Sequence, residues 1–388
     1  MPPQDDGSKL TATLILGRAN YLGITMIADG DEIKWRPEDR PPPDLIWNIH
    51  RHKCALLAIL AARDPEIYEG MGAELLLKLI EQPWRTWPAG WEHWPVTRFV
   101  YRLAAEQYFA SLSDEPAPGE GKGIVLVGGG IRYFPSVWVN IRVLRRRGCS
   151  LPVELWHLGR HEIGPKMEKI LEPFGVRCVS AEQSERQRPA RVLNGWELKS
   201  YALLNSRFRE IVYLDADNHV LINPDTIFTW PQYRDVGAVL WPDGTGMDPW
   251  PPDSPVWEVA SVPYRHEFQV EAGQLVIDKA RCTKALRMVH WYDQHSDYFY
   301  RFWWGDKESF HFGFRKAGKP YSMTSKPNQA LQCCICQHDF DGRRIFQHRV
   351  GDKWRLAEGN LRVAGFVDEE LCFGFLAELR ARWNGAIE

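Results

Sequence analysis

Short apolar runs alternate with helical patterns through the middle of the chain. Each run is too short for a helix, and segments with apolar residues at helical spacing, such as 134–147, separate the runs. Strands that are buried on both faces and joined by helices are typical of a parallel sheet. We therefore predict an α/β fold with a doubly wound, mostly parallel sheet. The predicted strands are 123–127, 153–158, 176–180, 211–214, 236–240 and 275–277.

The apolar run Ile211–Leu214 ends at two aspartates, Asp215 and Asp217. Residues i and i+2 of a strand point to the same face, and open α/β sheets bind ligands at the carboxyl ends of their strands. Two neighbouring carboxylates repel each other unless a cation lies between them, and oxygen ligands suit Mg²⁺ or Mn²⁺. The pair therefore predicts a divalent ion that holds a nucleotide diphosphate. The alternative is a plain turn, because Asp-Ala-Asp-Asn is also good turn chemistry.

The first part of the chain has a different pattern. We expect a helix to begin at 10–15, a hairpin turn at Asp29-Gly30-Asp31 and a second helix with Leu45 and Ile49 on its apolar side. The tryptophan-rich stretch 84–94 is expected to pack in a core, and 113–122 has the composition of a linker. The predicted domains are a small module at 1–65, a helical connector at 66–117, the α/β domain at 118–365 and a C-terminal helix at 366–388.

Composition and charge exclude several classes of protein. The 388 residues carry a net charge of −2, which argues against broad nucleic-acid binding. The eight cysteines are scattered apart from a cluster at 333–336, which lacks the C-x-x-C spacing of a zinc site, so we expect reduced thiols and no zinc. Residues 1–9 are polar, and no segment has the roughly 18 apolar residues of a membrane span. We expect a cytoplasmic protein, or one that is peripheral at the inner face of a membrane.

Five short motifs connect the chain with one enzyme class. They are Gly195-Trp196-Glu197-Leu198-Lys199, Leu214-Asp215-Ala216-Asp217-Asn218, Glu271-Ala272-Gly273-Gln274, Gly305-Asp306-Lys307-Glu308 and Gln337-His338-Asp339-Phe340-Asp341-Gly342. Over roughly residues 121–357 the chain resembles GT-A glycosyltransferases, in particular the fungal Golgi α-mannosyltransferases and their bacterial relatives. The resemblance implies a GT-A fold and transfer of mannose from GDP-mannose, or of another sugar from a UDP-sugar, to a glycan or other hydroxyl acceptor.

A later segment resembles the glycogenin-like motif H-x-x-G-x-x-K-P-W, with one residue fewer and without the proline. It runs from His348 through Gly351 to Lys353 and Trp354. The resemblance implies that His348 joins Asp215 and Asp217 in the metal site, with His338 as the competing candidate. Lysines would then meet the diphosphate, and a glycine loop after the first strand would let the donor approach the backbone. The predicted donor-binding residues are Lys199, Gly128, Gly129, Lys353 and Asp215.

Retention of configuration needs a group on the face opposite the leaving diphosphate. Either a carboxylate attacks, as in retaining glycosidases, or the leaving phosphate itself deprotonates the acceptor. Glu271, Asp306 and Glu308 are the catalytic candidates, and the sequence does not choose between the two routes. The alternative function is a non-catalytic carbohydrate- or partner-binding protein on the same fold. Residues 10–62 also resemble the docking domains of natural-product megasynthases, which implies a protein partner; the alternative is a helical cap on the main domain.

Overall fold

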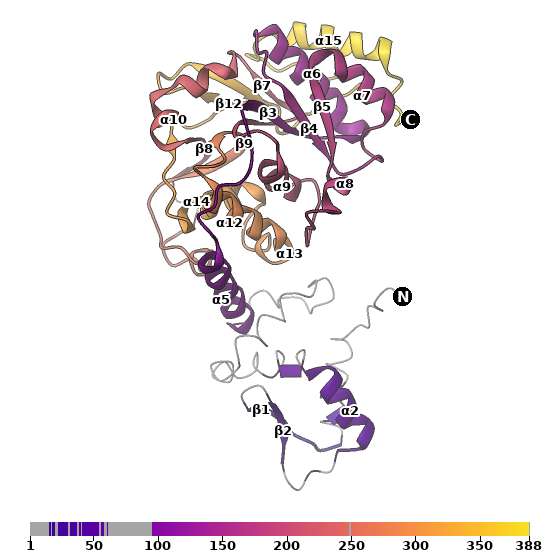
Figure 1. Cartoon of the computed structure of the whole chain (residues 1–388), viewed down its shortest axis with the longest axis vertical. Helices are drawn as coiled ribbons and strands as arrows, with labels where there is room; N and C mark the ends of the chain where they lie inside the picture. Colours follow the sequence, from indigo (N-terminus) through magenta and orange to yellow (C-terminus); the bar gives the residue numbers. More distant parts are fainter. Residues whose placement is uncertain are drawn as a thin grey trace. The chain divides into compact units, whose positions relative to one another are not determined.

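The computed structural model describes part of the first hundred residues and nearly all of the rest. The described residues are 15–16, 18–19, 22–29, 32–36, 39, 41–53, 56–57, 60, 95–247 and 250–387. The chain divides into two compact units, one formed by 1–111, 255–261 and 300–302, the other by 112–254, 262–299 and 303–388. Figure 1 labels the elements of both units. The division into four domains stays a prediction.

The described residues of the first unit contain the predicted hairpin and helix. Strand β1 (Met26–Asp29) pairs antiparallel with β2 (Glu32–Trp35), and helix α2 (Pro43–Arg51) buries Leu45 and Ile49. Helices α5 (Pro95–Ser111) and α11 (Pro255–Val259) belong to the same unit. The middle of the hairpin turn, most of the helix expected at 10–15 and the tryptophans of 84–94 lie outside the described residues.

A seven-stranded sheet forms the centre of the second unit in the described part of the chain. Every neighbouring pair is parallel except the two that β9 makes, because β9 runs against both β6 and β8. The α/β class and the mostly parallel sheet predicted from the sequence are therefore confirmed. In sheet order the strands are β10 (Ser322–Met323), β8 (Ala238–Met247), β9 (Phe268–Asp278), β6 (Glu210–Asp215), β3 (Lys122–Val127), β4 (Val153–His157) and β5 (Val176–Ser180).

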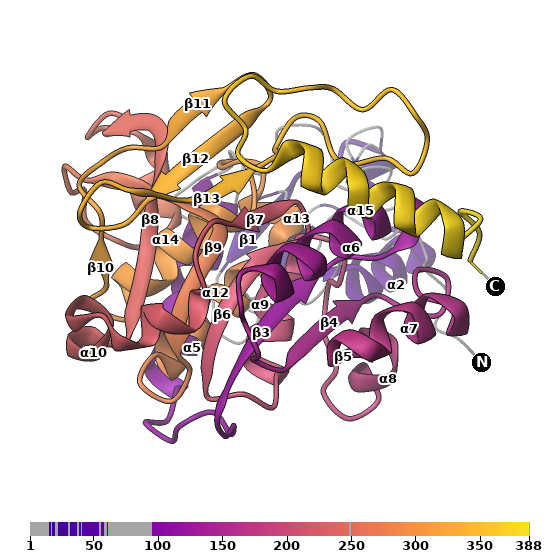
Figure 2. The ribbon, with the colours of Figure 1, turned by 90° about the horizontal axis from the view of Figure 1, so that it is seen from above.

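Helices cover both faces of this sheet, which makes it doubly wound. Alternate residues of β6 point into two different cores: Val212 and Leu214 into one, Ile211 and Tyr213 into the other, and all four are fully buried. Figure 2 shows α15 lying alongside α6 over the first core. The helices of the first core are α6 (Gly130–Arg146), α7 (Pro165–Leu171) and α15 (Glu369–Arg382); those of the second are α9 (Glu197–Asn205), α12 (Thr283–Gln294) and α14 (Asp306–Lys316).

A second sheet brings the C-terminal part of the chain back to β6. Its four strands, among the described residues, lie in the order β11 (Gln329–Leu331), β12 (Cys334–His338), β13 (Arg344–His348) and β7 (Asn218–Val220). β7 follows β6 after a two-residue turn and pairs antiparallel with β13. Shorter elements complete the unit: α8 (Ala181–Glu185), α10 (Pro231–Val236), α13 (Ser296–Phe299) and the 3₁₀ helices η4 (Glu172–Phe174) and η5 (Pro224–Thr229).

Two strands are longer than their sequence patterns predict. β8 was expected to end before Trp241, with a loop from residue 244, but it continues to Met247 because its extension pairs with β9 across irregular register shifts. β9 was expected to begin at Leu275, but it already includes Glu271–Gln274. This motif therefore lies on a buried strand rather than on a loop before it. No helix of the described residues is long and apolar enough to cross a membrane.

Gly313 marks the closest approach between α14 and α12. A Cβ atom there would lie 2.5 Å from Val289 Cγ2 and 2.8 Å from the Val289 backbone nitrogen. Alanine improves helix propensity by about 1 kcal/mol over glycine, but overpacking a core costs about 1–3 kcal/mol. We expect Gly313→Ala to lower the melting temperature in a circular dichroism melt.

The matched control is Gly374→Ala on α15. This glycine is also helical, but it is exposed and its Cβ would meet no atom within 4 Å. Alanine should therefore raise the melting temperature slightly through propensity alone. Equal melting temperatures for the two variants would show that α12 and α14 do not pack this closely.

Candidate active site

The two aspartates lie where the buried strand β6 ends. Asp215 is the last residue of β6, and Asp217 precedes β7. The side-chain amide of Asn140 on α6 donates to the Asp215 backbone carbonyl at 3.1 Å, and this hydrogen bond ties the turn after β6 to α6. Asp217 is buried, whereas the Asp215 side chain keeps 28% of its surface exposed. One carboxylate thus faces the interior and the other faces the opening of the site.

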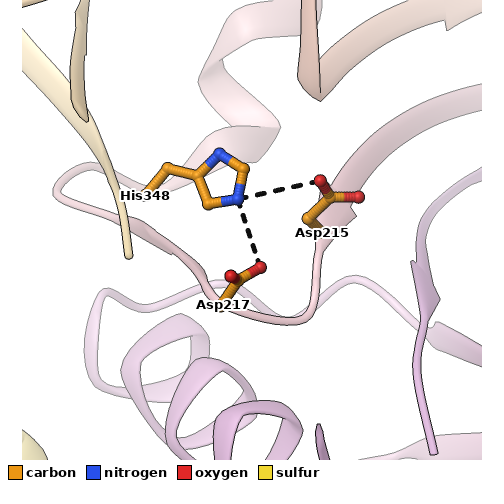
Figure 3. A group of neighbouring side chains, drawn as sticks. All are labelled: Asp215, Asp217 and His348. Atoms are coloured by element: carbon orange, nitrogen blue, oxygen red, sulfur yellow. Dashed lines mark hydrogen bonds and ion pairs between the residues drawn. The ribbon is translucent and has the colours of Figure 1, made fainter. Parts of the chain in front are cut away.

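β13 delivers a histidine to the same point. His348 is the last residue of β13 and is the register partner of Asn218 on β7, so the ladder between these strands places its ring beside the aspartates. Figure 3 shows one ring nitrogen turned toward both carboxylates. Nε2 lies 3.2 Å from Asp217 Oδ1 and 3.7 Å from Asp215 Oδ2.

These three side chains fit a divalent cation. Among the described residues they form a group in which one ligand atom from each lies within 4.8 Å of the others. The carboxylate oxygens suit Mn²⁺ or Mg²⁺, and the imidazole adds a nitrogen ligand. The structure therefore brings together all three predicted metal ligands.

Two lysines flank the carboxylates. Lys199 on α9 lies 3.2 Å from Asp215 Oδ1, forms an ion pair with Asp306, and donates to the Ala272 carbonyl at 2.9 Å. Lys353 forms an ion pair with Asp217 Oδ2. Lys199 is almost fully buried and Lys353 is partly exposed. The predicted donor-binding lysines therefore both lie at the aspartate pair, on opposite carboxylates.

Charge pairing controls the protonation of the site. Burial alone would raise the pKa of Asp217, but His348 and Lys353 outweigh burial and hold this pKa well below its usual range. Burial alone would lower the pKa of His348, but Asp217 and Glu271 outweigh it and raise this pKa to about 10. Lys199 is likewise held charged, because Asp215 and Asp306 outweigh its burial and raise its pKa. In the metal-free protein, cationic side chains therefore neutralise the carboxylates.

A cavity of about 210 Å³ opens next to the aspartates. Gly128 and Gly129 form part of its wall just before α6, and Gly130, the first residue of that helix, has φ of +70°. The helix N-terminus has no side-chain cap, but the Gly130 N–H donates to the Glu162 carbonyl at 2.8 Å. The positive end of the helix dipole lies beside the cavity, where it favours an anion. The cavity is lined by Val127, Gly128, Gly129, Tyr133, Leu158, Glu162, Gly195, Trp196, Leu198, Lys199, Tyr213, Asp215, Ala216, Asp217, Asp306 and Lys353.

Comparison with known proteins identifies the family. The profile of a family described as "Mannosyltransferase putative" matches residues 121–250 and 261–339, more than half of the chain. The chain belongs to this mannosyltransferase family. The reversed strand β9 between β6 and β8 agrees with the GT-A fold that its motifs predict.

Curated relatives of this mannosyltransferase family member come from fungi. The chain is 29% identical to alpha-1,2-mannosyltransferase MNN24 of Candida albicans over 251 residues, 54% of this chain and 35% of that protein. It is 30% identical to alpha-1,2-mannosyltransferase MNN5 of Saccharomyces cerevisiae over 150 residues, 38% of this chain and 25% of that protein. The chain thus matches only about a third or less of the length of these relatives. A solved active-site variant of LgtC matches 68% of this chain and all of its own chain, with a TM-score of 0.46 and 12% identity.

The remaining candidates lie at different distances from the cavity. Asp306 lines it and pairs with Lys199. Glu308 is buried two residues further along α14, and it is not among the described residues that line the cavity. Its carboxylate lies 3.4 Å from the Lys307 ammonium, and burial raises its pKa to about 7. His338, the competing metal candidate, lies on β12, where its backbone carbonyl accepts from Trp241 Nε1. Of the two histidines, the structure places His348 at the aspartates.

The segment that carries Lys353 is fixed to the mannosyltransferase fold by Arg349. This guanidinium is fully buried, donates to the Asp352 backbone and carboxylate at 2.7 Å each, and lies 3.8 Å from the centre of the Trp354 ring. Trp354 Nε1 in turn donates to His219 Nε2 at 2.7 Å. Lys353 is therefore held close to Asp217 by the residues on both sides of it.

Sequence reasoning gave no role to several residues of this site. Tyr213 O–H donates to Asp215 Oδ1 at 2.5 Å, and Asn218 Nδ2 donates to Gln274 Oε1 at 2.6 Å. Trp196, which is 59% exposed, and Tyr133 both line the cavity. The motifs quoted from the sequence include Asn218, Gln274 and Trp196, so these residues could have been proposed as site residues. Tyr213 had no such signal, because it resembles any other buried strand residue. Their partners could not be inferred without the fold.

Gly273 makes room for His348, and this contact generates a prediction. A Cβ atom at residue 273 would lie 2.4 Å from His348 Nδ1 and 2.9 Å from Glu271 Oε1. We expect Gly273→Ala to push the imidazole away from the aspartates and to weaken Mn²⁺ binding by about 10-fold or more, as for a disturbed ligand support. Isothermal titration calorimetry would measure this, with Gly374→Ala as the control for added methyl groups. Unchanged Mn²⁺ affinity in folded Gly273→Ala protein would remove His348 from the metal site.

Proposed function

We propose that the protein is a metal-dependent, retaining glycosyltransferase that transfers mannose from a nucleotide diphosphate sugar to a hydroxyl acceptor. The observation that carries this proposal is the meeting of Asp215, Asp217 and His348 beside two lysines at the wall of a cavity. Membership of the mannosyltransferase family supports the sugar, and GDP-mannose is the donor that fits it best, with a UDP-sugar as the second choice.

The site's own residues would bind and stabilise the diphosphate. A bound Mn²⁺ or Mg²⁺ would supply Lewis-acid stabilisation of the departing diphosphate. Lys353 is partly exposed, pairs with Asp217 and lines the cavity, so its ammonium can also pair with phosphate oxygens. The positive end of the α6 dipole, next to Gly128 and Gly129, would favour the negative charge of the same ligand. Negative charge that develops on the leaving group thus meets prearranged positive groups.

Two routes to retention remain open for this chain. Asp306 lines the cavity and is the carboxylate best placed to face the sugar, with Lys199 holding it in position. In the other route the leaving phosphate deprotonates the acceptor, and Asp306 orients the sugar. Glu308 stays a weaker candidate because it contacts Lys307 instead. The acceptor is a hydroxyl, of a glycan by analogy with the family.

Two further expectations accompany this proposal. Residues 1–65 would bind a protein partner, by their resemblance to docking domains, and the protein would act in the cytoplasm or at the inner face of a membrane. A pull-down with residues 1–65 as bait would test the first expectation. Fractionation of cells would test the second. Neither bears on the chemistry of the aspartate site.

The metal is the first thing to test. We expect Mn²⁺ to increase the affinity for GDP-mannose in calorimetric titrations and Asp217→Asn to abolish this increase, because one ligand and one charge are lost. The wild-type protein should also hydrolyse the donor slowly when Mn²⁺ is present. Full turnover by a metal-stripped sample in EDTA would contradict the proposal. Donor binding without any turnover would favour the alternative, a non-catalytic carbohydrate-binding protein.

His348 and Lys353 should differ in what they bind. Losing one ligand or one charge-assisted contact costs on the order of 1–3 kcal/mol. We expect His348→Ala to weaken Mn²⁺ binding in the absence of nucleotide, and Lys353→Ala to weaken GDP binding in saturating Mn²⁺ while sparing the metal. The matched control for the lysine is Lys169→Ala, an exposed lysine on α7. The roles are misassigned if Lys353→Ala lowers only the affinity for the metal.

A further inference from the structure

We propose that Glu271 is a positioning residue that orients the imidazole of His348 toward the metal site, and is not the nucleophile of the reaction. This assignment rests on the metal dependence of the proposed function. Of the three catalytic candidates, Asp306 and Glu308 then remain, and the role of the Glu-Ala-Gly-Gln motif is to orient His348.

The first observation is the arrangement of the two ring nitrogens of His348. In Figure 3 one nitrogen faces both aspartates, and the other points away from them. The nitrogen facing away, Nδ1, is buried and makes no hydrogen bond in the described structure, and the Glu271 Oε1 atom lies 3.5 Å from it. Metal-binding histidines commonly donate their second ring N–H to a carboxylate, which fixes the tautomer and the ring orientation. Glu271 occupies that position.

The second observation is that Glu271 is itself held. The Gly273 backbone N–H donates to Oε1 at 2.9 Å, and the Gln274 side chain donates to Oε2 at 2.5 Å. Gln274 is in turn bonded by Asn218, the residue that follows Asp217. Both carboxylate oxygens are therefore used within the support of the site. A nucleophile needs a lone pair directed at the sugar, and Glu271 does not line the cavity defined by the described residues.

The third observation is that the motif leaves space for this contact only because residue 273 is glycine. Its missing side chain is the volume through which the imidazole and the Glu271 carboxylate approach each other. Each residue of the motif thus has a part in the contact with His348. Glu271 is the acceptor, Gly273 leaves room for the ring, and the Gln274 amide holds the Glu271 carboxylate by a hydrogen bond. Asp306, which lines the cavity, is then the carboxylate left for the sugar.

The test measures metal affinity and turnover of the full-length chain together. We expect Glu271→Ala to raise the dissociation constant for Mn²⁺, measured calorimetrically without nucleotide, by about 10–100-fold. Glu271→Gln should have a smaller effect, since its amide oxygen still accepts from Nδ1–H but lacks the charge. Gln274→Met should also weaken Mn²⁺ binding, because it removes the hydrogen bond that holds the Glu271 carboxylate. In each variant, hydrolysis of GDP-mannose should return toward the wild-type rate at saturating Mn²⁺.

Glu154→Gln is the matched control. Glu154 is a buried carboxylate on β4 that pairs with Arg177 and Arg207 away from the cavity, so its loss should leave Mn²⁺ affinity unchanged. Turnover that stays lost in Glu271→Gln at saturating Mn²⁺, with normal metal affinity, would overturn the positioning role and make Glu271 the nucleophile. If Glu271→Ala does not fold, Glu271→Gln and Gln274→Met decide. A wild-type chain that binds no Mn²⁺ would instead refute the proposed function together with this assignment.

Discussion

The crowding of negative charge at the end of β6 is the constraint on which the site depends. Asp215 and Asp217 would repel each other in a partly buried space, and Asp306 and Glu271 add two more carboxylates nearby. Three cationic side chains offset this repulsion: Lys199, Lys353 and His348. Lys199 comes from α9, and His348 and Lys353 come from one segment near the C-terminus, so the charge balance holds together parts of the chain that are distant in sequence. A divalent ion entering the site must compete with these internal cations.

The reversed strand explains how so many of these groups reach one edge of the sheet. In a wholly parallel sheet, only residues at strand ends would meet at the carboxyl edge. Because β9 runs antiparallel to β6, Gln274 lies opposite Leu214, and the preceding residues of β9 extend beyond the end of β6. Glu271 therefore reaches the aspartate pair from within a strand that continues into the core.

The sequence predicted the parts of the site that are local. Asp215 and Asp217 follow from one buried strand and its period of two, whereas Lys199 was assigned through the resemblance to glycogenin-like enzymes. His348 entered only through a resemblance, because no local pattern shows that β13, a five-residue strand, will pair with the three residues of β7. Glu271 was predicted as a catalytic candidate, but its contact with the His348 imidazole could not be predicted, because this contact depends on the fold. The predicted β8 was too short, because Pro242 and Gly244 have weak strand propensity, which the pairing with β9 overrides in the folded protein.

The ladder between β7 and β13 also has a consequence for how the protein is made. Asp217 and His348 are 131 positions apart, and the pairing of β7 with β13 brings them together. Contacts of such high sequence separation form late, because closing the intervening loop costs entropy before the contact contributes any favourable free energy. During synthesis the aspartate strand leaves the ribosome well before His348 and Lys353, so Asp217 lacks these two cationic partners until the last part of the chain emerges. Assembly of this pocket is therefore expected to be among the last events of folding.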